Sequence, residues 1–121
     1  MKIFVAHSSN FDFRSKLYIP VRESALNTEH EVILPQEADI EEITRDMIQK
    51  CDVLVSEVSA PSLGAGIEMG WADAFGIPVI AMSEMGAKVS FSIDNVTTKR
   101  FEYESPDDML EKLQTALSSL K

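Results

Sequence analysis

One loop of this chain places residue types that can carry chemistry at close spacing. Serines at positions 59 and 62 and glycines at 64 and 66 lie between an apolar run and a helical pattern, and Glu68 follows. Glycine lets the backbone approach a ligand closely, and free N–H groups at a helix N-terminus favour an anion or a polar group. The Ser59 and Ser62 hydroxyls add donors, and a carboxylate in the first helical turn would point toward the same pocket.

The same pattern also has a structural interpretation, which the residue types alone leave open. A glycine-rich connection can be only a tight turn, and a first-turn glutamate is often a surface residue favoured by the helix dipole. The loop is not a Walker A loop, because it lacks Gly-Lys-Ser/Thr, and it is not a dinucleotide fingerprint, because the G-x-G-x-x-G spacing is absent.

Few other residues suggest chemistry. His7 ends the first apolar run, where it could hydrogen-bond a ligand or exchange a proton near neutral pH, or serve only as a structural residue. Gln36 follows the second apolar run and could contact sugar hydroxyls. With two histidines far apart and one cysteine, Cys51, we predict no metal site. Trp71 could stack a base, pack an interface or belong to the core.

The elements that position these residues alternate along the chain. Apolar runs alternate with helical patterns, which is typical of βαβ units and a parallel sheet. Strands are expected at residues 3–6, 31–34, 53–58, 78–82 and 97–103. Helices are expected at residues 12–27, 40–50, 66–75 and from 106 onward.

Single residues mark some of these boundaries. Pro20 should kink or split the first helix, Gly76 should be the C′ residue of the third, and Ser105 should cap the last, with Pro106 at its first position. The predicted fold class is α/β, a flavodoxin- or Rossmann-like three-layer sandwich with a five-stranded, mainly parallel sheet. Such sheets bind ligands outside the carboxyl ends of their strands, where the loops at residues 7–10 and 59–66 should lie.

The composition of the chain argues against some classes of function. The 121 residues suit one domain, 1–121, and 45% of them are hydrophobic, enough for a packed core. A net charge of −9 repels a phosphate backbone, so binding of polymeric nucleic acid is not expected. No apolar stretch has the length of a membrane span, and the start is too short for a signal peptide, so we expect no membrane association and a cytoplasmic protein.

Residues 56–72, Ser-Glu-Val-Ser-Ala-Pro-Ser-Leu-Gly-Ala-Gly-Ile-Glu-Met-Gly-Trp-Ala, resemble the signature of the nucleoside 2-deoxyribosyltransferase family. That family also includes the 2′-deoxynucleoside 5′-monophosphate N-glycosidases. The resemblance extends to the first strand and its polar loop, to residues 51–55 and to residues 78–80. It implies a pocket for a small nucleoside or nucleotide, with no cofactor. Glu68 matches the glutamate that attacks C1′ as the base leaves, before the glycosyl group passes to another base or to water.

The resemblance also implies further site residues. Ser8, Ser59, Ser62 and Gly64 match positions that line the pocket. Ser90 matches a serine that, in the glycosidase branch, reaches the phosphate site of a neighbouring subunit. Because the family is oligomeric, with sites at subunit interfaces, a homodimer or a higher homo-oligomer is expected.

Three positions depart from the family pattern. Phe4 stands where many relatives have a tyrosine whose hydroxyl positions the catalytic glutamate. Thr44 stands where relatives have an aspartate that handles the base or the sugar. Asp46 follows about 200° further around a helix, so it could serve only if that helix is shifted or broken. Asn10 replaces the arginine of the phosphate site and lacks its guanidinium fork.

The expected function is cleavage or transfer at the N-glycosidic bond of a (deoxy)nucleoside or its 5′-monophosphate, with Glu68 as nucleophile. The alternative is a catalytically inactive nucleotide or nucleotide-sugar sensor on the same fold, which Phe4, Thr44 and Asn10 favour. A third possibility is hydrolysis of a ribonucleotide or a modified nucleotide. The intact signature around Glu68 favours an enzyme, and the sequence leaves the base, the sugar and the acceptor open.

Overall fold

The computed structural model of the chain describes residues 1–38 and 42–120. Five strands form one sheet in the order β2-β1-β3-β4-β5, and every neighbouring pair is parallel. This is the flavodoxin-like strand order, and it confirms the predicted fold class. The strands are β1 (Lys2–His7), β2 (Glu31–Ile33), β3 (Val53–Glu57), β4 (Val79–Glu84) and β5 (Arg100–Tyr103).

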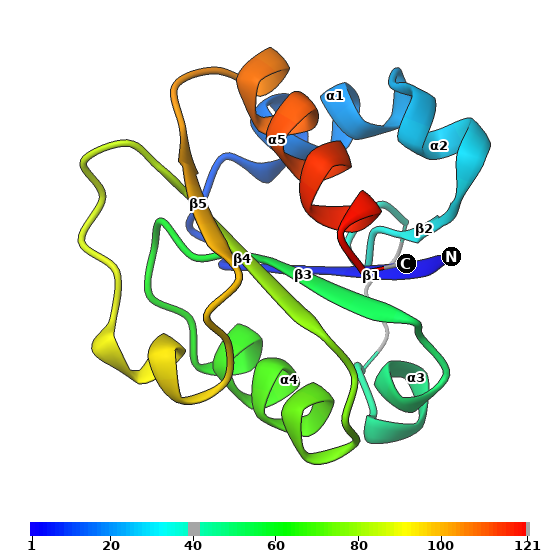
Figure 1. Ribbon diagram of the computed structural model, residues 1–121, viewed down its shortest axis with the longest axis vertical. Coiled ribbons are helices and arrows are strands. Elements are labelled where there is room, and N and C mark those ends of the chain that lie inside the picture. The colour runs from blue at the N-terminus through cyan, green and yellow to red at the C-terminus, as the bar shows by residue number, and fades with distance from the viewer. Residues whose placement is uncertain (39–41, 121) are drawn as a thin grey trace.

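Helices cover both faces of the sheet and complete three layers (Figure 1). On one face lie α1, α2 and α5, and on the other lie α3 and α4. A turn of π-helix, η1, precedes α1, and a short 3-10 helix, η2, precedes β5. The bounds are η1 (Arg14–Tyr18), α1 (Ile19–Arg22), α2 (Ala25–Glu29), α3 (Arg45–Gln49), α4 (Leu63–Ala74), η2 (Phe91–Asn95) and α5 (Pro106–Ser118).

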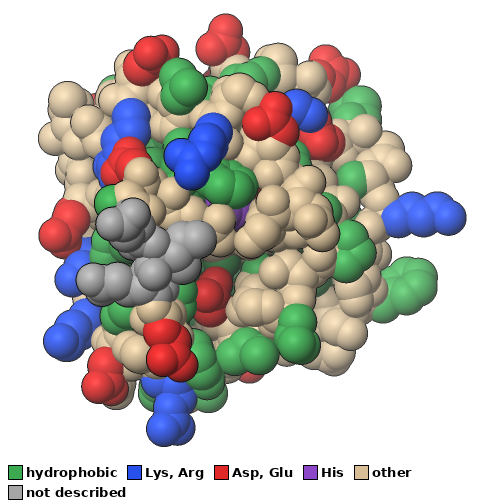
Figure 2. Space-filling view, turned by 180° about the vertical axis from the view of Figure 1, so that it is seen from behind, with side chains coloured by type: hydrophobic (Ala, Val, Ile, Leu, Met, Phe, Trp, Pro, Cys, Tyr) green, Lys and Arg blue, Asp and Glu red, His purple; other side chains and the backbone are tan. Residues whose placement is uncertain are grey.

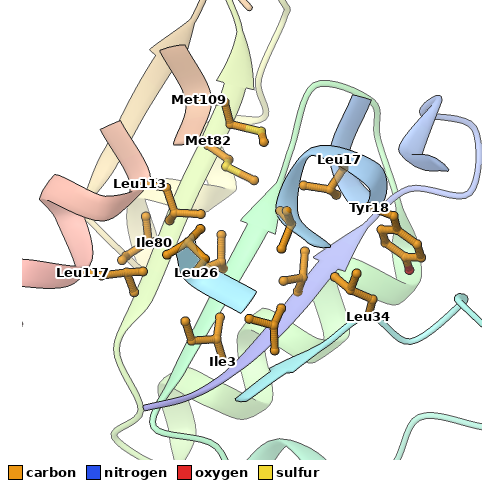
Figure 3. Packing of buried hydrophobic residues seen from close by; sticks show 14 of the residues in the cluster. Ile3, Leu17, Tyr18, Leu26, Leu34, Ile80, Met82, Met109, Leu113 and Leu117 are labelled. Atoms are coloured by element: carbon orange, nitrogen blue, oxygen red, sulfur yellow. The ribbon is translucent and has the colours of Figure 1, made fainter. Parts of the chain in front are cut away.

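Two apolar clusters hold the layers together, because successive side chains of a strand point to opposite faces. Residues such as Ile3, Ile80 and Met82 face the layer of α1, α2 and α5, and they share one apolar cluster with Met109 and Leu113 of α5 (Figure 3). Each fully buried side chain of this size contributes about 1.5–3 kcal/mol. The other cluster packs the sheet against α3 and α4. It combines large residues such as Phe4 and Leu54 with the alanines Ala65 and Ala72 of α4.

The predicted first helix, residues 12–27, is split as expected. Pro20 lies in the first turn of α1, after the π-helical turn η1. Its missing N–H would interrupt a continuous helix at this point. Ser24 then caps α2 by accepting a hydrogen bond from the Leu26 N–H.

The helix that carries Glu68 begins earlier than predicted. Ser62 is its N-cap and accepts a hydrogen bond from the Ala65 N–H, so α4 starts at Leu63 and not at Gly66. Gly64 therefore lies in the first turn of the helix, and Glu68 lies in its second turn. The connection from β3 is correspondingly shorter than the predicted 59–66 loop.

Other boundaries differ for local reasons. The helix predicted at 40–50 corresponds to the shorter α3. Thr44 caps α3 and has an extended backbone, so the helix begins at Arg45. The predicted start of this helix lies outside the described residues. Strand β5 starts at Arg100 and not at residue 97, where the Thr97 hydroxyl donates to the Val79 carbonyl. Gly76 has a φ of 72° after the end of α4, as predicted for a C′ residue.

Among the described helices, none is long and apolar enough to cross a membrane.

Candidate functional site

A cavity of about 190 Å³ lies where the carboxyl ends of β1 and β2 meet the start of α4. This is the edge at which parallel sheets bind ligands. Half-buried Glu68 reaches the cavity from α4. The lining residues are His7, Ser9, Pro35, Gln36, Ile43, Ser62, Gly64, Ala65 and Glu68.

The carboxylate of Glu68 has an unusual environment. Burial raises the pKa of Glu68 to about 7, because a low-dielectric surrounding disfavours the charged form. Within residues 1–38 and 42–120 the carboxylate makes no hydrogen bond or ion pair that would offset this effect. Both protonation states are therefore accessible near neutral pH, and both oxygens are available to a ligand.

His7 is held in one state by its neighbours. The Ser8 carbonyl can only accept a hydrogen bond, so Nδ1 of His7 donates to it at 2.9 Å. Burial lowers the pKa of His7 and keeps the ring neutral, so Nε2 accepts from the Tyr18 hydroxyl at 2.6 Å. Tyr18 keeps this proton because burial raises its pKa to about 12. The ring of His7 stacks on Phe13, and both of its nitrogens are engaged within the protein.

The same tyrosine fixes the opposite wall of the cavity. The Tyr18 hydroxyl accepts a hydrogen bond from the Gln36 N–H at 3.0 Å. The Gln36 side-chain amide donates to the Ser9 hydroxyl at 3.2 Å, so both groups stand beside the cavity. Ser9 was not among the predicted site residues, although its place after the first strand was a signal for it.

The structure gathers some of the predicted site residues and separates others. His7, Ser62, Gly64 and Glu68 share the cavity. Ser8 is buried behind it, where its hydroxyl accepts from the Asn10 N–H at 3.0 Å.

The positions that depart from the family pattern do not line the Glu68 cavity. Asn10 is exposed and does not line the cavity. Thr44 and Asp46 are exposed at the start of α3, where the Thr44 hydroxyl accepts from the Met47 N–H; from this segment Ile43 lines the cavity instead. Phe4 is fully buried in the cluster beneath α4. Trp71 packs against the same cluster.

A second, largely apolar cavity of about 450 Å³ adjoins the first and shares Ser62 and Ala65 with it. Ser90, the N-cap of η2, lines this groove beside Lys88. Leu63 is 84% exposed at its edge, and Phe91 next to Ser90 is 91% exposed. The face drawn in Figure 2 likewise shows apolar side chains protruding among acidic and basic ones. The structure therefore places Ser90 in this groove and not in the Glu68 cavity.

Glu57 forms a buried polar cluster that the sequence did not single out, because it looks like an ordinary residue of the third strand. It is 1% exposed, and its carboxylate is bonded to Ser59 and to the Tyr103 hydroxyl. Ser59, predicted to contact ligand, is thus held by the protein. Within the parts of the chain that are described, no group of three His, Cys, Asp or Glu side chains could hold a metal ion.

Comparisons with known proteins identify relatives of this chain. The chain is 40% identical over 76 residues to a protein of Thermofilum pendens, and 34% identical over 74 residues to one of Syntrophotalea carbinolica. Both are named as 2′-deoxynucleoside 5′-phosphate N-hydrolases. Each alignment covers 59% of this chain, and 53% and 52% of the respective relative, so the chain spans about half the length of the curated relatives it matches.

Solved structures share the fold. The CMP N-glycosidase of Clostridium botulinum superposes with a TM-score of 0.69 at 21% identity, covering 94% of this chain and 99% of that one. The 2-deoxyribosyltransferase of Bacillus psychrosaccharolyticus gives a TM-score of 0.65 at 21% identity and covers 90% of each chain. The sequence profile described as nucleoside 2-deoxyribosyltransferase matches residues 4–110. The chain therefore belongs to the nucleoside 2-deoxyribosyltransferase family.

Proposed function

We propose that this chain cleaves or transfers at the N-glycosidic bond of a (deoxy)nucleoside or its 5′-monophosphate, with Glu68 as nucleophile. The observation that carries the proposal is the Glu68 carboxylate, half-buried in a cavity with a pKa of about 7 and no protein partner among the described residues. A desolvated, perturbed carboxylate in a cavity is typical of an active site. The names of the two curated relatives support the same chemistry.

The reaction proceeds in two displacements. A Glu68 oxygen forms a bond to C1′ while the bond from C1′ to the base nitrogen breaks. The electron pair of the broken bond stays on the base, which takes a proton from solvent. The transition state has oxocarbenium character, as in retaining glycosidases. Water or the nitrogen of a second base then attacks C1′, the bond from C1′ to Glu68 breaks to release the carboxylate, and the attacking group loses its proton to solvent.

The remaining cavity residues have binding roles in this proposal. The hydroxyl of Ser9 and the amide of Gln36 can hydrogen-bond sugar or base from one wall. The backbone at Gly64 lies in the first turn of α4, where the helix dipole favours an anionic or polar group. His7 holds its wall in place, because both of its ring nitrogens are already bonded.

We also propose that residues 1–121 act as one domain in a cytoplasmic homodimer or higher homo-oligomer. Its support is the apolar groove beside the site, with Leu63 and Phe91 exposed next to it. Exposed apolar patches on a protein surface mark sites of association. A subunit seated there would bring its residues close to the Glu68 cavity.

A chromatographic assay for free base tests the catalytic proposal. The protein is incubated with deoxynucleosides, ribonucleosides and their 5′-monophosphates, with and without an acceptor base. Glu68→Gln keeps the shape of the side chain but removes the nucleophile, so base release should fall by about 10³-fold or more. Asp73→Asn, at an exposed acid on the same helix, is the matched control and should leave the rate unchanged.

The same assay separates the alternatives. Exchange of one base for another identifies a transferase, and release without exchange identifies a hydrolase. The exposed positions of Thr44 and Asp46, outside the cavity lining, favour the sensor alternative. A nucleotide that raises the melting temperature while no substrate loses its base would reject the enzyme and support the sensor.

A further inference from the structure

The chain between β3 and α4 is held by one buried carboxylate. Glu57 is the last residue of β3, and one of its oxygens accepts the Ser59 N–H at 2.6 Å. The other oxygen accepts the Ser59 hydroxyl at 3.0 Å and the hydroxyl of Tyr103, the last residue of β5. Three donors thus converge on a side chain that is 1% exposed.

Glu57 and the three groups that donate to it form an anchor for this segment, and Ser59 links the anchor to a third strand. Its hydroxyl oxygen accepts the N–H of Glu84, the last residue of β4, at 2.7 Å. One residue before Ser59, the Val58 N–H donates a backbone hydrogen bond to the Met82 carbonyl of β4. Ser59 is bonded to Glu57 and to Glu84 of β4, whereas the Ser62 hydroxyl bonds within the start of α4.

Burying the carboxylate of Glu57 costs desolvation free energy. Burial raises the pKa of Glu57, and the hydrogen bonds from Tyr103 and Ser59 oppose that rise. Within the described chain Glu57 has no ion pair, so these donors are what compensate its desolvation. A carboxylate offers more acceptor sites than any neutral side chain of this size, which suits a residue that must hold several donors at once.

We propose that Glu57 is a positioning residue for the reaction at Glu68. By holding Ser59 against β4 and β5, it fixes residues 60–62 and with them the start of α4. Ser62 and Gly64, which form one wall of the Glu68 cavity, are set by this anchor. The inference rests on the proposed function. Glu57 does not line the Glu68 cavity but borders the adjoining groove, so it is assigned a role through Ser59 and not through contact with the substrate.

The anchor should affect binding more than chemistry. Glu68 lies in the second turn of α4, which is already fixed by Ala65, Met69 and Ala72 packed on the sheet. Ser62 precedes that packing and depends on the chain before it. Loosening the anchor should therefore raise KM while kcat changes little.

Two variants test the anchor. Glu57→Gln keeps one acceptor for the Ser59 N–H but turns the other oxygen into a donor that faces two hydroxyls. Tyr103→Phe removes only the hydroxyl and keeps the ring. We expect KM for base release to rise about tenfold in Glu57→Gln, the equivalent of one hydrogen bond to a charged group. A smaller rise is expected in Tyr103→Phe, with kcat within about twofold of wild type in both.

The matched control is Glu102→Gln, beside Tyr103. Glu102 is exposed and accepts from the Gly86 N–H, with no bond to the anchor. Its KM should be unchanged. An unchanged KM in both anchor variants would overturn the proposal, and so would a fall in kcat without a change in KM.

Amide hydrogen exchange supplies a readout that needs no activity. Faster exchange confined to residues 59–66 in Glu57→Gln supports the anchor, whereas exchange that is unchanged, or faster throughout the chain, rejects it. If wild type releases no base, the proposed function fails while the exchange result still decides whether Glu57 holds this segment. If Glu57→Gln does not fold, Tyr103→Phe and Ser59→Ala carry the same test.

Discussion

At the residue scale, Glu68 and Glu57 show two ways of placing a carboxylate out of water. Glu57 is surrounded by donors that hold it, whereas Glu68 has none among the described residues and keeps a pKa of about 7. The first arrangement suits a fixed structural link. The second leaves a group that can change its protonation state and its bonding partner during a reaction.

The pKa of Glu68 predicts the pH dependence of the reaction. A raised pKa means that the acid retains its proton up to neutral pH, and a protonated carboxyl cannot attack C1′. We therefore expect kcat/KM to increase as the pH rises through about 7 and then to level off. Base release measured from about pH 5 to about pH 9 checks this. A kcat/KM that is constant below pH 7 would contradict it, and Asp73→Asn should retain the wild-type profile.

At the element scale, the ends of helices were predictable where a single capping residue or a proline determines them. Pro20 split a helix and Ser105 capped α5, as expected. The start of α4 differs from the prediction because the low helix propensity of Gly64 favours a loop, whereas the Ser62 cap and packing on the sheet outweigh that propensity.

The cap of α4 predicts a variant with two effects. Ser62→Ala removes the bond to the Ala65 N–H, so the free energy of unfolding should fall by about 1 kcal/mol. Because Ser62 also lines the cavity, substrate binding should weaken. Ser105→Ala removes the cap of α5, whose hydroxyl accepts from the Asp108 N–H, and should cost similar stability without changing binding. Urea unfolding and KM measure the two effects, and equal KM values in the two variants would argue against a binding role for Ser62.

At the scale of the whole molecule, the rule that parallel strands bind ligands at their carboxyl ends explains how much of the site was predictable. The rule predicts that His7 and Glu68, which are distant in the sequence, lie at the same edge of the sheet, and both of them line the cavity. The Tyr18 bond to His7 and the Tyr103 bond to Glu57 were not predictable, because they depend on how helix and strand pack in three dimensions. Periodicity specifies which face a residue takes, but not which side chain it meets there.

The exposed apolar groove predicts an assembly. Light scattering should give a mass of two or more chains for wild type. Phe91→Ser should lower it, because a 91% exposed phenyl ring has little role within one chain. Ile19→Ser, at a 53% exposed residue of α1, is the control and should keep the wild-type mass. A wild-type mass of one chain would reject the homo-oligomer.

The strand order also has a consequence for synthesis on the ribosome. In the order β2-β1-β3-β4-β5, each strand after the first emerges with a neighbour already made, so the sheet can grow by addition at its edges. The residues that line the Glu68 cavity all lie within the first 68 positions. The groups that lock the segment before α4, the Glu84 N–H and the Tyr103 hydroxyl, are translated later. A nascent chain therefore contains every residue that lines its cavity before it contains the two groups that hold the segment in front of α4.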